Sequence, residues 1–105
     1  MKLKNKVSIV TGSASGFGKG IAELFSKEGS KVIVADINEQ SGQKVADDIT
    51  GLGGKAKFIK TDVSNKDSMK NLVEETNEIF GKLDILVSNA GWSYSNKPSI
   101  EVTES

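Results

Sequence analysis

The feature that most constrains the fold of this chain is the alternation of short apolar runs with amphipathic segments. Four runs, near residues 7–10, 32–35, 56–59 and 83–87, have the length and composition of β-strands. The first, second and fourth are almost continuously apolar, as expected for strands that are covered on both faces. The three segments between them carry apolar residues at helical spacing. This order predicts a single α/β domain in which helices flank a parallel sheet.

Turn and capping residues indicate where the helices begin and end. Gly29 and Gly81 follow the first and third helical patterns, where glycine commonly ends a helix. Ser64, with Asp67 three residues later, is predicted to cap the N-terminus of the third helix. The last segment, 92–105, has no strand pattern, so we expect a loop there that leads into the start of another helix.

Composition excludes several classes of function. The chain has 105 residues, and its 14 basic and 14 acidic residues cancel, which gives no support for a nucleic-acid or membrane partner. Cysteine and histidine are both absent, so disulfides and thiolate metal sites are excluded and no metal site is expected. The apolar run near the N-terminus is too short for a signal peptide or a membrane span, and we expect a cytoplasmic domain.

The stretch T-G-S-A-S-G-F-G at 11–18 joins the first strand to the first helix. A helix N-terminus offers unpaired N–H groups and a positive dipole end, and a diphosphate suits that position. Gly12 permits a tight turn, while Gly16 and Gly18 keep Cβ atoms away from a phosphate and from the neighbouring strand. The spacing G-x-x-x-G-x-G differs from G-x-G-x-x-G and from a P-loop. An ordinary glycine-rich turn is the alternative, and with Gly20 the spacing also suits some methyltransferases.

Polar residues follow the other predicted strands. Asp36 ends the second strand, where a carboxylate can accept hydrogen bonds from the ribose hydroxyls of an adenosine. Asp62 and Val63 follow the third strand, and S-N-A-G at 88–91 follows the fourth. Each could simply turn the chain. Together they lie at the carboxyl ends of parallel strands, the edge at which open α/β sheets bind ligands.

These motifs together resemble the short-chain dehydrogenase/reductase family, and the resemblance covers essentially the whole chain. It implies a Rossmann-type parallel sheet with strand order 3-2-1-4, incomplete here, a nicotinamide cofactor, and interconversion of an alcohol and a carbonyl by hydride transfer. Residues 1–91 would form the dinucleotide-binding half. The cofactor-binding residues that the resemblance implies are Gly12, Ser13, Ser15, Gly16, Phe17 and Gly18 for the diphosphate and ribose, Asp36 for the ribose hydroxyls with Ile37 next to it, Asp62 and Val63 for the adenine, and Asn89, Ala90 and Gly91 beside the cofactor ribose.

The chain departs from the family pattern in three respects. Ser88 stands where the family usually has Asn, and Phe17 stands where it usually has Ile or Leu. The catalytic Ser and the Tyr-x-x-x-Lys pair of the family are absent, since the single tyrosine, Tyr94, has Lys97 three residues on and not four. We therefore assign no catalytic residue and expect a truncated, NAD-binding part of an oxidoreductase that is inactive alone.

Two further expectations complete this interpretation. We expect the full-length enzyme to act on a small carbonyl or alcohol and to form a homo-oligomer. The alternative function is a freestanding, non-catalytic dinucleotide-binding module. A methyltransferase half is the third interpretation. Without a fifth parallel strand, the run at 83–87 would be an open apolar edge, and such an edge invites pairing with another chain. On that ground the chain is predicted not to be a stable monomer.

Overall fold

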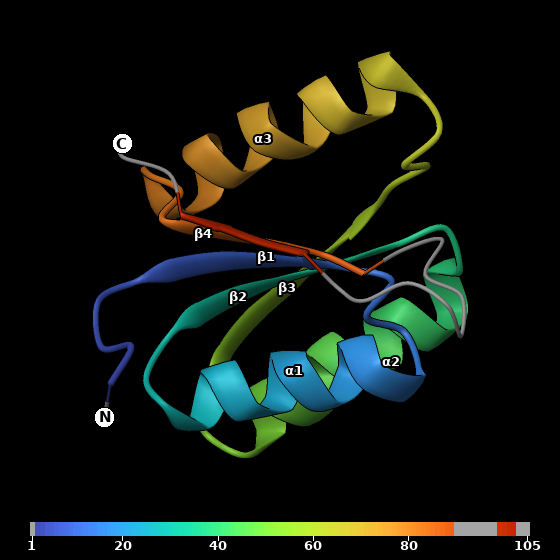
Figure 1. Ribbon diagram of the computed structural model, residues 1–105. Coiled ribbons are helices and arrows are strands. Elements are labelled where there is room, and N and C mark those ends of the chain that lie inside the picture. The colour runs from blue at the N-terminus through green and yellow to red at the C-terminus, as the bar shows by residue number, and fades with distance from the viewer. Residues whose placement is uncertain (1, 90–98, 103–105) are drawn as a thin grey trace.

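The computed structural model describes residues 2–89 and 99–102, which form a sheet between two layers of helices (Figure 1). In chain order the elements are β1 (Val7–Thr11), α1 (Gly16–Lys27), β2 (Lys31–Asp36), α2 (Glu39–Gly51), β3 (Lys55–Lys60), α3 (Lys66–Phe80), β4 (Ile85–Ser88) and β5 (Ser99–Val102). The strand order is β3-β2-β1-β4-β5, and the first four strands are parallel. The predicted parallel sheet with order 3-2-1-4 is therefore confirmed.

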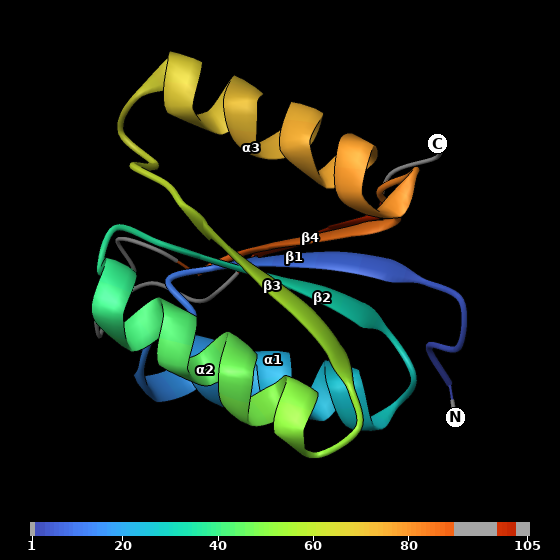
Figure 2. The same ribbon diagram turned by 180° about the vertical axis from the view of Figure 1, so that it is seen from behind.

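Helices α1 and α2 cover one face of the sheet and α3 lies on the other, as the two opposite views show (Figures 1 and 2). Strand β2 shows why its sequence is continuously apolar. Val32 and Val34 point into the core beneath α1 and α2, whereas Ile33 and Ala35 belong to the core beneath α3. Successive side chains of a strand point to opposite faces, so a strand covered on both sides needs apolar residues at every position.

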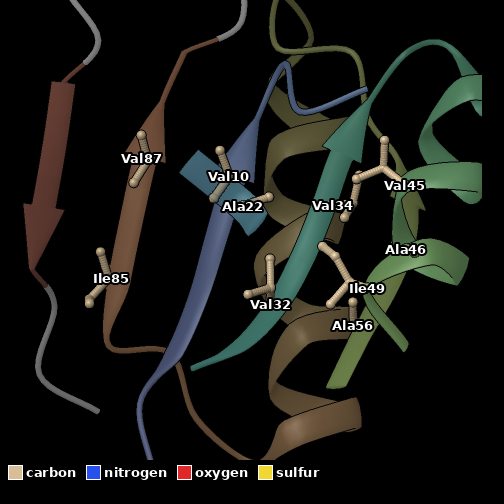
Figure 3. Close-up of a cluster of buried hydrophobic side chains, with 10 residues drawn as sticks. All are labelled: Val10, Ala22, Val32, Val34, Val45, Ala46, Ile49, Ala56, Ile85 and Val87. Atoms are coloured by element: carbon tan, nitrogen blue, oxygen red, sulfur yellow. The ribbon is translucent and has the colours of Figure 1, made fainter. Parts of the chain in front are cut away.

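The larger core lies between the sheet and the helix pair α1–α2 (Figure 3). Val10 of β1 and Val87 of β4 are fully buried there together with Ala22 of α1. These contacts hold α1 against β1 and β4. They therefore fix the position of its N-terminus relative to the carboxyl edge, where the candidate site lies.

The cap of α3 differs from the prediction. Asn65, and not Ser64, is the N-cap residue, and its side-chain oxygen accepts a hydrogen bond from the Ser68 N–H at 2.9 Å. The Ser64 hydroxyl instead donates to the Asp62 carboxylate at 2.6 Å. Two adjacent residues with capping side chains compete here, and the carboxylate already holds the serine.

The predicted loop at the C-terminal end is wrong over residues 99–102. This segment forms β5, which pairs antiparallel with β4 in a register that sets Ile85 opposite Val102 and Ser88 opposite Ser99. The expected open edge at β4 is therefore also wrong, and with it the stated reason against a stable monomer. A four-residue antiparallel strand needs only an unpaired neighbour, and β4 provides one. The helix start predicted at Thr103 and Glu104 lies outside the described residues.

Candidate functional site

The glycine turn between β1 and α1 is built as its spacing suggests. Gly12 and Gly16 both have positive φ, 65° and 60°, which favours glycine. Gly18 is required for a different reason. A Cβ on Gly18 would overlap the carbonyl oxygen of Gly12 and lie 2.7 Å from the side-chain nitrogen of Asn89. The turn can thus follow β1 closely only because this helical position has no side chain.

The N-terminus of α1 differs from those of the other two helices. Asn38 caps α2 and Asn65 caps α3 through side-chain hydrogen bonds, but Ser15, the N-cap of α1, makes none. The first turn of α1 also has no acidic residue. Backbone N–H groups at such a helix end suit an anion, and a phosphate would complete the cap that Ser15 does not provide.

Asp36 lies beside this turn, at the end of β2. Its carboxylate accepts one hydrogen bond from the Ala14 N–H at 3.0 Å and another from the Asn38 N–H at 2.9 Å. No ion pair involves Asp36 within residues 2–89. A ribose hydroxyl that reached this carboxylate would sit within a few ångströms of the diphosphate turn, as the two halves of one nucleotide require.

Ser13 is placed differently from the other residues of the turn. It is fully buried, and its hydroxyl donates to the Val10 carbonyl at 2.6 Å and accepts from the Ala35 N–H at 3.1 Å. Ser13 therefore has no exposed surface with which to make the expected contact with a dinucleotide. Ser15 and Gly16, in contrast, are exposed.

Asn89, after β4, closes the other side of the turn. Its N–H donates to the Thr11 hydroxyl at 2.8 Å, and its side-chain nitrogen donates to the Gly12 carbonyl at 3.3 Å. Its side-chain oxygen is buried and has no hydrogen-bond partner among the described residues. A buried amide oxygen normally has a donor, so this atom fits a ligand hydroxyl at the site. Ala90 and Gly91 lie outside the described residues.

Asp62 is held in a tight loop after β3. Its carboxylate accepts from the hydroxyl and the N–H of Ser64, and these bonds hold the pKa of Asp62 below its usual range. The Asp62 N–H donates to the Ser68 hydroxyl at 2.8 Å. Sequence reasoning missed this use of Ser64, because the same serine also fits a helix cap.

Three exposed apolar side chains follow the first three strands. Phe17 is 65% exposed, Ile37 is 60% exposed and Val63 is 39% exposed. All three are among the predicted site residues, and each lies at the carboxyl edge. Apolar groups in such positions can cover the flat faces of a base, so they fit a ligand that carries aromatic rings.

Other kinds of site receive no support from the described residues. Residues 2–89 contain no group of acidic side chains that could hold a metal ion. Across the same described part of the chain, every helix is too short or too polar to cross a membrane. The glycine turn, Asp36 and Asn89 together fit a dinucleotide.

Comparison with known proteins agrees with this geometry. The sequence model of the short chain dehydrogenase family matches residues 6–105. The chain is 46% identical to tropinone reductase-like 1 of Erythroxylum coca, over 99% of this chain and 37% of that protein. It is 43% identical to secoisolariciresinol dehydrogenase of Forsythia intermedia, over 94% of this chain and 35% of that protein.

A solved structure gives the same result for the fold. A hydroxysteroid dehydrogenase from Escherichia coli superposes with a TM-score of 0.83 at 39% identity, over 86% of this chain and 37% of that one. The chain thus spans little more than a third of the length of the curated relatives described above. Members of this family are oxidoreductases that use nicotinamide dinucleotides. The chain belongs to the short-chain dehydrogenase/reductase family.

Proposed function

We propose that this chain is the NAD-binding part of a short-chain oxidoreductase that interconverts an alcohol and a carbonyl by hydride transfer. The observation that carries the proposal is the hydrogen bond from the Ala14 N–H to the Asp36 carboxylate, at 3.0 Å. It joins the turn that suits a diphosphate to the carboxylate that suits a ribose. The contact between these two separate features of the sequence supports a single nucleotide site.

Each part of the site has a role in holding the cofactor. The N-terminus of α1, with Gly12 and Gly16, would bind the diphosphate, and Asp36 would accept hydrogen bonds from the adenosine ribose. Asp62, Val63 and Ile37 would border the adenine. Asn89 would offer its unpartnered oxygen to a hydroxyl of the cofactor, with Ala90 and Gly91 next to it. The bound nicotinamide supplies or accepts the hydride.

Asp36 supports a preference for NAD over NADP. A 2′-phosphate would meet this carboxylate, which forms no ion pair within residues 2–89. The next residue, Ile37, is apolar. Like-charge contacts of this kind cost several kcal/mol in a desolvated interface.

The names of the relatives also favour a cofactor role for this segment. Tropinone, secoisolariciresinol and hydroxysteroids are chemically unlike one another, yet the proteins named for them share this segment. A common cofactor site explains the shared segment better than a common substrate pocket does. We further propose that the longer enzyme acts on a small carbonyl or alcohol as a cytoplasmic homo-oligomer.

The 105 residues contain no Tyr-x-x-x-Lys pair. Without a positioned acid or base a reaction loses about 10²–10⁴-fold in rate, and substrate positioning is lost as well. We therefore expect the chain to bind NADH without oxidising it in the presence of a panel of ketones.

Isothermal titration calorimetry with NADH and NADPH tests the proposal. NADH should bind at least tenfold more tightly than NADPH, and Asp36→Asn should reduce that ratio. Equal affinities, or a ratio that Asp36→Asn leaves unchanged, would contradict NAD preference. No binding of either cofactor would contradict the proposed function itself.

A second candidate is a freestanding, non-catalytic dinucleotide-binding module. It is favoured by β5, which pairs with β4 along the side of the sheet where the family places a fifth parallel strand. The two candidates differ in one observation at the gene. A reading frame that continues beyond Ser105 into a Tyr-x-x-x-Lys segment supports the enzyme, and a stop codon there supports the module.

A further inference from the structure

Ser13 connects the glycine turn to the end of β2 through reciprocal hydrogen bonds with Ala35. Its hydroxyl accepts from the Ala35 N–H at 3.1 Å, and its own N–H donates to the Ala35 carbonyl at 3.4 Å. The next residue along each segment repeats the connection, because the Ala14 N–H donates to the Asp36 carboxylate at 3.0 Å. Ser13 and Ala14 on one segment thus face Ala35 and Asp36 on the other.

The Ser13 hydroxyl also forms a hydrogen bond with β1. It donates to the Val10 carbonyl at 2.6 Å, and the residue is fully buried. A buried hydroxyl that gives and receives hydrogen bonds is expensive to disturb, because its partners would be left unsatisfied in a water-free region. It can therefore hold the turn and the end of β2 in one fixed relation.

We infer that Ser13 is a positioning residue that sets where the Asp36 carboxylate stands relative to the diphosphate turn, and thereby sets the preference between NAD and NADP. This inference rests on the proposed function. Ser13 itself does not touch the cofactor. It acts through Asp36, because the repulsion of a 2′-phosphate depends steeply on the distance of the carboxylate.

The chain offers a matched control in Ser30. This second buried serine hydroxyl lies at the opposite end of the same two strands, within 3.2 Å of the Lys6 carbonyl and 2.9 Å of the Lys31 carbonyl. Removing either hydroxyl should destabilise the domain for the same reason. Only Ser13 lies next to the candidate site.

The test is the ratio of the NADPH and NADH dissociation constants, measured by calorimetry on the full chain for the wild type, Ser13→Ala and Ser30→Ala. A partly unfolded population weakens both apparent affinities equally, so the ratio does not respond to stability alone. Ser13→Ala should lower the ratio about threefold to tenfold, as expected for the loss of a positioning hydrogen bond. Ser30→Ala should leave it unchanged. In an Asp36→Asn background, Ser13→Ala should have no further effect on it.

Ser13→Cys keeps the shape of the side chain with a somewhat larger atom and forms weaker hydrogen bonds, and it serves if Ser13→Ala does not fold. Its ratio should fall between those of the wild type and Asp36→Asn. An unchanged ratio in a folded Ser13 variant, or an equal fall in Ser30→Ala, would overturn the inference and leave the proposed function standing. A wild-type chain that binds neither cofactor would overturn both.

Discussion

The amino ends and the carboxyl ends of the parallel strands, called here the amino edge and the carboxyl edge, differ in how their polar groups are satisfied. At the amino edge, the Ser8 and Ser30 hydroxyls lie 2.6 Å apart, and the Asp84 carboxylate accepts from the Val7 N–H and from the Lys82 side chain. At the carboxyl edge, the Asn89 side-chain oxygen is buried without a partner among the described residues, and Ser15 leaves α1 without a side-chain cap. The amino edge satisfies its polar groups within the chain, whereas the carboxyl edge leaves groups that suit a ligand.

The difference shows which polar residues stabilise the fold and which prepare a site. A buried polar group whose hydrogen-bonding capacity is filled within the chain contributes to stability and gains little from a ligand. A group left without a partner costs stability, and a ligand that pairs with it removes that cost. The four predictions below test this division.

The largest effect is expected at Gly18. In Gly18→Ala the new Cβ would overlap the Gly12 carbonyl and crowd Asn89, so the turn must move away from β1. We expect a loss of about 3 kcal/mol in the free energy of unfolding and no detectable NADH binding, measured by urea denaturation and calorimetry.

Gly20→Ala is the matched control for Gly18→Ala. Gly20 lies in the same helix, and a Cβ there meets nothing within 4 Å. Replacing a helical glycine by alanine should raise stability by about 0.5–1 kcal/mol and leave NADH affinity as it was. Equal behaviour of the two variants would show that the close approach at Gly18 does not matter.

A smaller effect is expected at Asp84 of the amino edge. Asp84→Ala leaves the Val7 N–H without its acceptor and should cost about 2 kcal/mol in the free energy of unfolding. NADH affinity, measured on the folded variant, should not change. A marked fall in NADH affinity would contradict the conclusion that polar groups at the amino edge stabilise the fold without contributing to the site.

The pH dependence of stability belongs to the same residue. Partial burial raises the pKa of Asp84, but the Val7 N–H and the Lys82 ammonium outweigh it, so the pKa lies below its usual range. A carboxylate with a lowered folded pKa contributes stability above its unfolded pKa, about 3.9, and this contribution is lost as the pH falls through the folded pKa. Asp84→Asn should therefore flatten the loss of stability below about pH 4 in thermal melts.

The smallest effects are expected at the helix N-termini. Asn65→Ala removes the cap of α3 and should cost about 1 kcal/mol. Ser15→Ala removes no capping hydrogen bond and should leave the melting temperature of the free chain nearly unchanged. If Ser15→Ala destabilised the free chain as much as Asn65→Ala, this would contradict the absence of a side-chain cap at the N-terminus of α1.

Much of the fold could be predicted because it depends on local patterns. The continuous apolar run of β2 follows from burial on both faces, and Gly29 and Gly81 end their helices with positive φ as expected. The cap of α3 could not be predicted, since Ser64 and Asn65 are both good caps and only the position of Asp62 decides between them.

The members of the candidate site were proposed from sequence patterns, and their binding of a cofactor stays a prediction; their individual geometry could not be predicted. Glycine spacing and strand-end acids indicated Gly12, Gly16 and Asp36, because their coincidence at the carboxyl ends of parallel strands is typical of a nucleotide site. The pattern assigned Ser13 the same role as its neighbours. Only the paired ends of β1 and β2 show that its side chain points into the protein.

The sequence by itself determined the succession of strands and helices, their apolar faces and the edge at which polar residues collect, because these depend on periodicity and on residue type. Tertiary structure alone decided that residues 99–102 pair with β4 and that Asp36 receives the Ala14 N–H. Each of these joins segments that are apart in the chain. Such contacts depend on where packed strands and helices bring backbone atoms together. The spacing of residues along one segment does not predict these positions.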